Sequence, residues 1–232
     1  HVDTTRNVMN WSPTLDFRYR FNKQSNLRIN YRGTSSQPSM SQLLSITDNT
    51  DPQNVSVGNP GLKPAFTENF RFFYNTYRQS HYQGFMTFLN FSTTRNAIGN
   101  SVYYDSETGA RTVKPVNVNG NWNANAAIMF NTSIDSAGIW NVNTFTNLGY
   151  NRYASYLQLR TMDEMEKNIT KSMTMSERLS ASYRLSWLEV ELDGSLNYTH
   201  TKNNLQPTSN LNTWQFAYGT SINLTLPWNM SI

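Results

Sequence analysis

Five arginines near the start of the chain stand at spacings that could bind an anionic group. They are Arg18, Arg20, Arg28, Arg32 and Arg71. Residues two or four positions apart in an extended chain project from the same face of a strand, so the first four form two same-face pairs. A row of guanidinium groups could draw an anionic substrate inward by focusing the local field. It could equally pair with carboxylates of another part of the protein that packs against it.

The other titratable residues give weaker indications of chemistry. The histidines are His1, His81 and His200. They are far apart and lack ligand spacing, so we expect ordinary surface positions rather than a metal site. The acidic group Asp163, Glu164 and Glu166 could meet a cation, but we favour a solvated loop tip. There is no cysteine, no nucleophile motif and no phosphate-binding loop, so we expect no catalytic residue, no metal and no cofactor.

The segments that must position these residues show a two-residue alternation of apolar and polar side chains. Leu15, Phe17, Tyr19 and Phe21 alternate with Asp16, Arg18, Arg20 and Asn22. Successive side chains of a strand point to opposite faces, so each segment has one apolar and one polar face. In a soluble sandwich the apolar faces meet inside. In a transmembrane barrel they face lipid, and polar residues line the lumen.

The alternation predicts nine strands and no long helix. We place them near residues 14–22, 26–34, 66–78, 82–94, 120–132, 139–153, 172–187, 189–202 and 213–226. Tight connections alternate with long ones, the long ones being 35–65, 95–119, 154–171 and 203–212. In an up-and-down meander all tight turns then lie at one end, as in outer-membrane barrels. A short helical turn is expected at 38–44, with proline in its first turn.

The composition agrees with a membrane barrel. Charged residues make up 15% of the chain, below the roughly 25% of soluble domains, and mean hydropathy is −0.61. No apolar run approaches the length of a transmembrane helix. The net charge is +4, but lysine and arginine are scattered, so we expect no nucleic-acid partner. The N-terminus lacks a secretory signal, and we expect an internal or trimmed piece of a longer protein.

Tryptophan and asparagine are placed as in a barrel wall. Trp11, Trp122 and Trp214 lie next to long connections, and Trp140, Trp187 and Trp228 lie next to tight ones. Tryptophan prefers the headgroup level of a bilayer, so the two sets predict aromatic girdles at both rims. Asparagine is disfavoured in strands, yet it recurs on the polar faces of 121–125 and 141–151. A hydrated lumen, or one filled by a polar plug, accounts for these ladders.

A family resemblance rests on the two long connections before the middle of the chain. The motifs are Pro-Ser-Met-Ser-Gln-Leu at 38–43, Asp-Pro at 51–52 and Gly-Asn-Pro-Gly-Leu-Lys-Pro at 58–64. They resemble loops of TonB-dependent outer-membrane receptors of Gram-negative bacteria. Residues 104–109 with 115–120 look like the next hairpin of that family, and 226–228 like a later periplasmic turn. We expect Pro60 and Pro64 to stiffen the motif at 58–64, and Gly58 and Gly61 to permit positive φ there.

The resemblance implies a fold and a function. Residues 1–232 would be one portion of an antiparallel, up-and-down transmembrane barrel of about 22 strands whose lumen is plugged. The plug domain and the TonB-contacting segment would lie outside this chain. Such receptors import a siderophore, cofactor, peptide or glycan across the outer membrane, and a surface lipoprotein could assist. Outer-membrane lipid, the plug, the TonB complex and the transported ligand are the expected partners, with the arginines facing the plug. Tyr103 and Tyr104 would help to capture ligand.

Two other functions stay open at this point. A secreted, soluble β-sandwich could bind carbohydrate through exposed aromatic side chains, and it would remain monomeric without detergent. A passive structural or adhesive barrel could bind partners through its loops.

Overall fold

The computed structural model describes residues 9–48, 50–159, 162, 164–226 and 230–231. Nine long strands form one continuous antiparallel sheet in which each strand pairs with the next along the chain. They are β1 (Thr14–Asn22), β2 (Ser25–Ser36), β5 (Ala65–Arg78), β6 (Gln83–Arg95), β9 (Asn121–Ser133), β10 (Trp140–Gln158), β11 (Glu166–Arg184), β12 (Leu188–Asn203) and β13 (Leu211–Leu226). The predicted all-β meander is confirmed.

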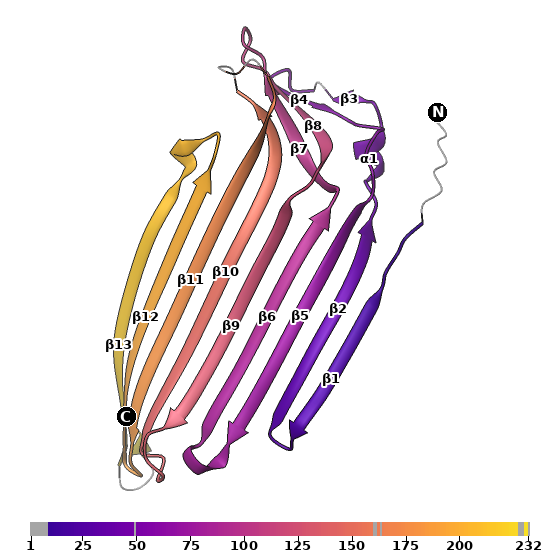
Figure 1. Ribbon diagram of the computed structural model, residues 1–232. Helices are drawn as coiled ribbons and strands as arrows, with labels where there is room; N and C mark the ends of the chain where they lie inside the picture. Colours follow the sequence, from indigo (N-terminus) through magenta and orange to yellow (C-terminus); the bar gives the residue numbers. More distant parts are fainter. Residues whose placement is uncertain (1–8, 49, 160–161, 163, 227–229, 232) are drawn as a thin grey trace.

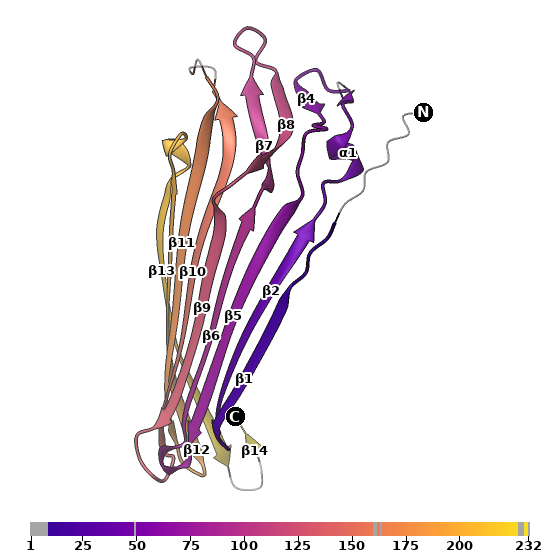
Figure 2. The ribbon, with the colours of Figure 1, turned by 45° about the vertical axis from the view of Figure 1, so that its right-hand side comes forward.

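The sheet is a single curved layer and does not close on itself within the described residues (Figures 1 and 2). β1 and β13 are its edges, and the short β14 (Met230–Ser231) pairs with the end of β13. No second sheet packs on either face in the part of the chain that the structure describes, so the β-sandwich interpretation is wrong. Apolar side chains of the long strands stay exposed: Phe17 by 47% and Leu89 by 43%.

The connections sort by length as the sequence predicts. Four tight connections lie at one end of the sheet, the lower end in Figure 1, and four long ones lie at the other. The lower ones are residues 23–24, 79–82, 134–139 and 185–187. The upper ones join β2 to β5, β6 to β9, β10 to β11 and β12 to β13. We call these the turn end and the loop end of the sheet.

The loop end contains more regular structure than the sequence predicts. The first long connection carries α1 (Met40–Leu43), β3 (Thr47–Asp48) and β4 (Asn54–Val57), and the second carries the hairpin β7 (Ala97–Tyr104) and β8 (Arg111–Val118). β8 pairs with β4 and β7 pairs with β10, both in parallel. η1 (Gln79–His81) lies at the turn end and η2 (Pro207–Ser209) in the last long connection. The expected loops 35–65 and 95–119 are therefore partly strands.

Two boundaries also differ from the prediction. β10 and β11 are 19 residues each, so they pair through most of the expected loop 154–171, and Glu166 begins β11. The helical turn at 38–44 forms, but its N-cap is Ser39, whose hydroxyl accepts from the Gln42 amide at 3.3 Å while the Gln42 side chain accepts from the Ser39 amide at 2.9 Å. Pro38 therefore precedes this capping box instead of lying inside the first turn.

The ladder gives the sheet two chemically distinct faces. One cross-strand row begins Phe17, Ile29, Phe72, Leu89, Ala126 and Leu148. The neighbouring row on the other side begins Asp16, Asn30, Arg71, Asn90 and Asn125. We call them the apolar face and the polar face. The buried apolar residues gather instead at the loop end, where the connections pack: Leu62, Ala65, Ala97, Val118, Ala154 and Leu157.

The turn between β9 and β10 yields a pH-dependent prediction. The Asp135 carboxylate accepts the amides of Trp140 at 2.7 Å and Ile139 at 3.0 Å, and these bonds lower the pKa of Asp135 below its ordinary value of 3.8. A lowered folded-state pKa stabilises the fold above pH 3.8, and this contribution is lost as pH falls through the lowered value. We therefore expect Asp135→Ala to reduce the thermal midpoint in detergent at pH 7.

The same difference in thermal midpoint should shrink as the pH falls below 3.8 and through the lowered pKa of Asp135, since the parent protein then loses the charged carboxylate. Glu107→Ala, which removes an exposed acid from the β7–β8 turn, is the matched control and should leave the midpoint unchanged. A midpoint for Asp135→Ala equal to that of the parent protein at pH 7 contradicts the assignment.

Candidate functional site

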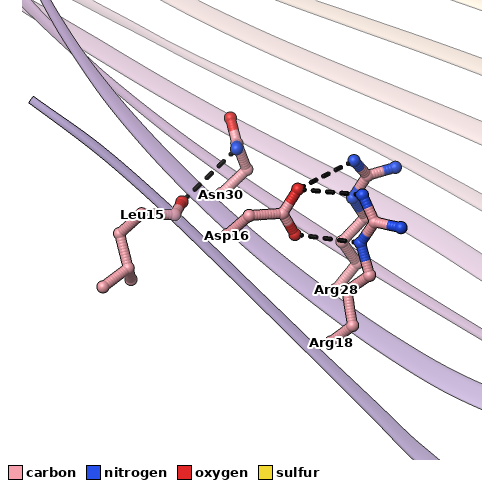
Figure 3. Close-up of polar contacts among 5 residues, drawn as sticks. All are labelled: Leu15, Asp16, Arg18, Arg28 and Asn30. Carbon is pink, nitrogen blue, oxygen red and sulfur yellow. Dashed lines mark hydrogen bonds and ion pairs between the residues drawn. The ribbon is translucent and has the colours of Figure 1, made fainter. Parts of the chain in front are cut away.

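An ion-pair cluster lies on the polar face of β1 and β2. The antiparallel register places Arg18 directly opposite Arg28. Asp16 lies between them: its carboxylate accepts Nε and Nη2 of Arg18 at 3.1 and 3.0 Å and Nη2 of Arg28 at 3.0 Å (Figure 3). Like charges directly opposite on paired strands repel, so the shared carboxylate makes this arrangement stable.

An aromatic pair lies beside this cluster on the polar face of β5 and β6. Phe73 is opposite Arg28 and Phe88 is opposite Phe73, with ring centroids 4.7 Å apart. Arg28, Arg71 and the two rings line a hollow of about 620 Å³, together with Asn30 and Asn90. A second hollow of about 320 Å³ shares Arg28 and Phe73 and is also lined by Arg18 and Arg20. The two hollows together form one stretch of the polar face, which is lined by arginines and by the rings of Phe73 and Phe88.

The charge of this stretch is strongly unbalanced. Across β1, β2 and β5, the polar face carries the arginines at 18, 20, 28, 32 and 71 and a single acid, Asp16. Ion pairs of Arg20, Arg32 and Arg71 do not occur among the described residues. Guanidinium groups bind carboxylate and phosphate through two parallel hydrogen bonds. The surface can therefore hold an anionic group beside an aromatic or apolar one.

The predicted site residues divide into two separate groups. Arg18, Arg20, Arg28 and Arg32 share the polar face of β1 and β2, as the alternation predicts. Tyr103 and Tyr104 lie on β7, in the hairpin above the long strands, and the structure does not bring them to the arginines (Figure 1). Tyr103 is 39% exposed at the loop end.

Sequence reasoning missed Phe73 and Phe88. A signal was present, because Phe72, Phe73 and Tyr74 form three consecutive aromatic residues and thus break the alternation. One of the three must lie on the polar face, and it is Phe73.

The remaining candidates stay apart from this surface. His200 lies on the apolar face with its ring stacked on Tyr198, the centroids being 6.4 Å apart. His1, Asp163 and the side chain of His81 lie outside the described residues. Glu164 is exposed, and Glu166 pairs with Leu157 at the start of β11. Within the described ranges, no group of three or more His, Cys, Asp or Glu residues could hold a metal ion.

The two long connections that carry the loop motifs are joined by asparagine side chains. Asn59 donates from Nδ2 to the Pro115 carbonyl at 2.9 Å. Asn117 accepts the Lys63 amide at 2.7 Å and donates to the carbonyls of Lys63 and Asn96 at 2.9 and 2.8 Å. We call Asn59, Lys63, Asn96 and Asn117 the rim clamp.

The expected role of the glycines in this motif is wrong. Positive φ among the described glycines occurs at Gly109, Gly120 and Gly138, not at Gly58 or Gly61. Gly58 is needed for space: a Cβ there would lie 1.7 Å from the Leu44 carbonyl oxygen. The motif at 58–64 is thus a point of close backbone approach.

The family model described as "Outer membrane protein beta-barrel family" matches residues 1–163. The chain belongs to this family. No curated protein and no solved structure matches it. Membership gives an outer-membrane location in a Gram-negative bacterium. In such barrels the apolar face contacts lipid, the polar face lines the interior, and short turns are periplasmic while long loops are extracellular.

This orientation defines the environment of the hollow, the rim clamp and the tryptophans. The arginine-rich hollow belongs to the inner wall of the barrel, and the rim clamp holds the extracellular loops. Trp122 and Trp214 lie near the extracellular ends of β9 and β13, and Trp140 and Trp187 lie at the periplasmic ends of β10 and β12. Trp228 lies outside the described residues. Helices long and apolar enough to cross a membrane do not occur in the described parts of the chain.

The rim clamp predicts a measurable loss of local stability in Asn117→Ala. The substitution removes three hydrogen bonds, which should raise the free energy of the closed loops by about 2 kcal/mol. Amide hydrogen exchange at Lys63 should accelerate accordingly. The matched control is Asn100→Ala, an exposed amide of the same hairpin. Protection of the Lys63 amide that survives the loss of Asn117 would show that the clamp does not hold the loops.

Proposed function

We propose that this chain is part of the barrel of a TonB-dependent outer-membrane receptor that imports a scarce nutrient. The observation that carries the proposal is the cationic and aromatic surface on the inner wall, with Arg28, Arg71, Phe73 and Phe88 at its centre. A passive structural barrel has no need of five arginines facing its interior beside one acid. The loop motifs that resemble this receptor class, and the clamp that they form, support the same function.

The inner-wall arginines serve mainly to hold a plug domain. Asp16 neutralises part of the charge of Arg18 and Arg28, whereas Arg20, Arg32 and Arg71 have no ion-pair partner in the described residues. Carboxylates of a plug would form ion pairs with these three arginines, and the aromatic pair would give the same surface an apolar contact with the plug. Field focusing on an anionic nutrient is the alternative role of the same side chains.

The loop end is the place of ligand capture. The β7–β8 hairpin extends beyond the long strands and presents Tyr103. Tyrosine offers an aromatic surface and a hydroxyl, which suits siderophores, cofactors, peptides and glycans alike. Tyr104 and a surface lipoprotein are further proposed contributors. The proposal includes no enzymatic step.

The transport proposal predicts energy-dependent uptake. In the native bacterium, deletion of the gene should abolish uptake of one labelled nutrient from a panel of siderophores, cofactors, peptides and glycans. Uptake by the parent strain should stop when an uncoupler collapses the proton-motive force or when TonB is removed. Uptake of the whole panel unaltered by the deletion would support the passive structural barrel instead. Uptake that persists with the uncoupler would contradict TonB coupling.

The two roles of the arginines predict different phenotypes for Arg28→Glu/Arg71→Glu in the complete receptor. If the arginines hold a plug, charge reversal should loosen it and let a large antibiotic such as vancomycin enter, even in a strain without TonB. If they steer ligand, the barrel should stay sealed while uptake of an anionic nutrient slows and loses its salt dependence. Lys23→Glu/Arg78→Glu, at two exposed cations of the turn end, is the matched control. A sealed barrel with unchanged uptake removes both roles.

A further inference from the structure

The apolar face becomes basic at its extracellular end. The register of β10, β11 and β12 places Arg152, Lys171 and Lys202 side by side in one cross-strand row. Adjacent strands are about 4.8 Å apart, so the three residues span about 10 Å. Lys171 and Lys202 are exposed, and the three residues form no ion pair with any described residue. We call this row the basic row.

No acid of these strands neutralises the basic row. The one acid on the apolar face of β10, β11 and β12, within the described residues, is Glu177. It lies six residues further along β11 than Lys171, and its carboxylate accepts the Thr146 hydroxyl at 2.5 Å. Glu68, on the same face of β5, is paired with Arg95 at 3.1 Å. Like charges directly opposite on paired strands are unfavourable, so an external anion between them would stabilise the row.

The guanidinium of Arg152 is held in position by the backbone. Its Nη1 donates to the carbonyl of Gly120, just before β9. Gly120 has a φ of +103°, and a Cβ at this position would collide with the guanidinium. Gly120 is therefore a positioning residue: it orients one cation of the row before any ligand arrives.

An apolar hollow lies directly below the basic row, toward the membrane centre. Ala124, Tyr150 and Met173 form the next cross-strand row, about 7 Å along the strands. The small side chains of Ala124 and Ala126 leave a hollow of about 390 Å³ between larger apolar neighbours, among them Phe70 and Phe91.

Trp122 lies on β9 directly opposite Arg152, at one end of the basic row, and its two ring neighbours line the hollow. Its ring stacks on Tyr150 at 4.7 Å and lies 5.9 Å from Phe91. Indole prefers the headgroup level of a bilayer, so the junction of the basic row and the hollow matches the level at which lipid headgroups meet acyl chains.

We infer that this surface binds a phosphorylated, acylated lipid of the outer leaflet. The phosphate contacts Arg152, Lys171 and Lys202, and an acyl chain enters the hollow over Ala124 and Ala126. Charge complementarity selects an anionic headgroup, and the adjacency of row and hollow selects a lipid over a free anion. The inference depends on the outward orientation of the apolar face, not on nutrient transport.

The test is binding of lipid A to the full-length protein in dodecyl maltoside micelles, measured by native mass spectrometry. The probes are lipid A with two phosphates, its dephosphorylated counterpart and inorganic phosphate. The parent protein should bind the phosphorylated lipid more tightly than the dephosphorylated one. Lys171→Gln/Lys202→Gln should weaken binding of the phosphorylated lipid about tenfold or more and leave the other unchanged.

Three further variants isolate the cause of this loss. Lys171→Arg/Lys202→Arg keeps the charge and should restore binding, which excludes a folding defect. Lys23→Gln/Arg78→Gln removes two exposed cations from the periplasmic end and should bind as the parent does. Ala126→Phe fills the hollow and should weaken binding of the lipid while preserving the preference for phosphate.

Several outcomes would overturn the inference. One is equal affinity of the parent for the phosphorylated and dephosphorylated lipids, and another is full affinity in Lys171→Gln/Lys202→Gln. Displacement of lipid A by equimolar inorganic phosphate would assign the row to a free anion. The assay uses neither TonB nor nutrient, so its failure and the failure of the transport proposal are distinguishable.

Discussion

The main-chain hydrogen-bond ladder is the constraint on which the rest of the structure depends. Hydrocarbon offers no partner to an N–H or C=O group, so a chain that crosses it without helices must pair every strand. The meander from β1 to β13 does this through nine long strands. The same ladder fixes which side chains meet. Phe17 and Asp16 are neighbours in sequence, yet they begin cross-strand rows that face lipid and barrel interior respectively.

Where the strands emerge into water, hydrogen bonds from side-chain amides replace the main-chain ladder in holding the chain. Water can satisfy irregular backbone there, so the connections are free to cross over one another. Asn59 and Asn117 each bind main-chain groups of the other connection and thereby fix two loops that are far apart in sequence. This polar junction, rather than apolar packing alone, sets the base of the β7–β8 hairpin. A binding surface on that hairpin is consequently held by the barrel wall.

The sequence predicts structure well where lipid imposes the two-residue period and less well elsewhere. All nine long strands lie within a few residues of their predicted positions except at the loop ends of β10 and β11. There the strands extend beyond the lipid-facing segment, so residues such as Asn168 and Thr170 need not alternate with apolar ones. The close approach of Leu44 to Gly58 and the pairing of Arg18 with Arg28 depend on tertiary register, which composition and spacing do not contain. The polar-face arginines were predictable as a set, but their aromatic neighbours Phe73 and Phe88 were not.

The distribution of acids explains why the two groups of arginine and lysine residues need different partners. On the inner wall, Asp16 is close enough to neutralise Arg18 and Arg28 because all three share one face of one hairpin. On the outer rim, the acids nearest in sequence do not neutralise the basic row. Asp193 and Lys202 belong to the same strand, but the alternation sends the carboxylate to the interior and the ammonium to the lipid boundary. Two charged residues of one strand share a face only when they are an even number of positions apart. This spacing, more than distance along the chain, therefore decides which charges are left unpaired within this chain and can bind groups outside it.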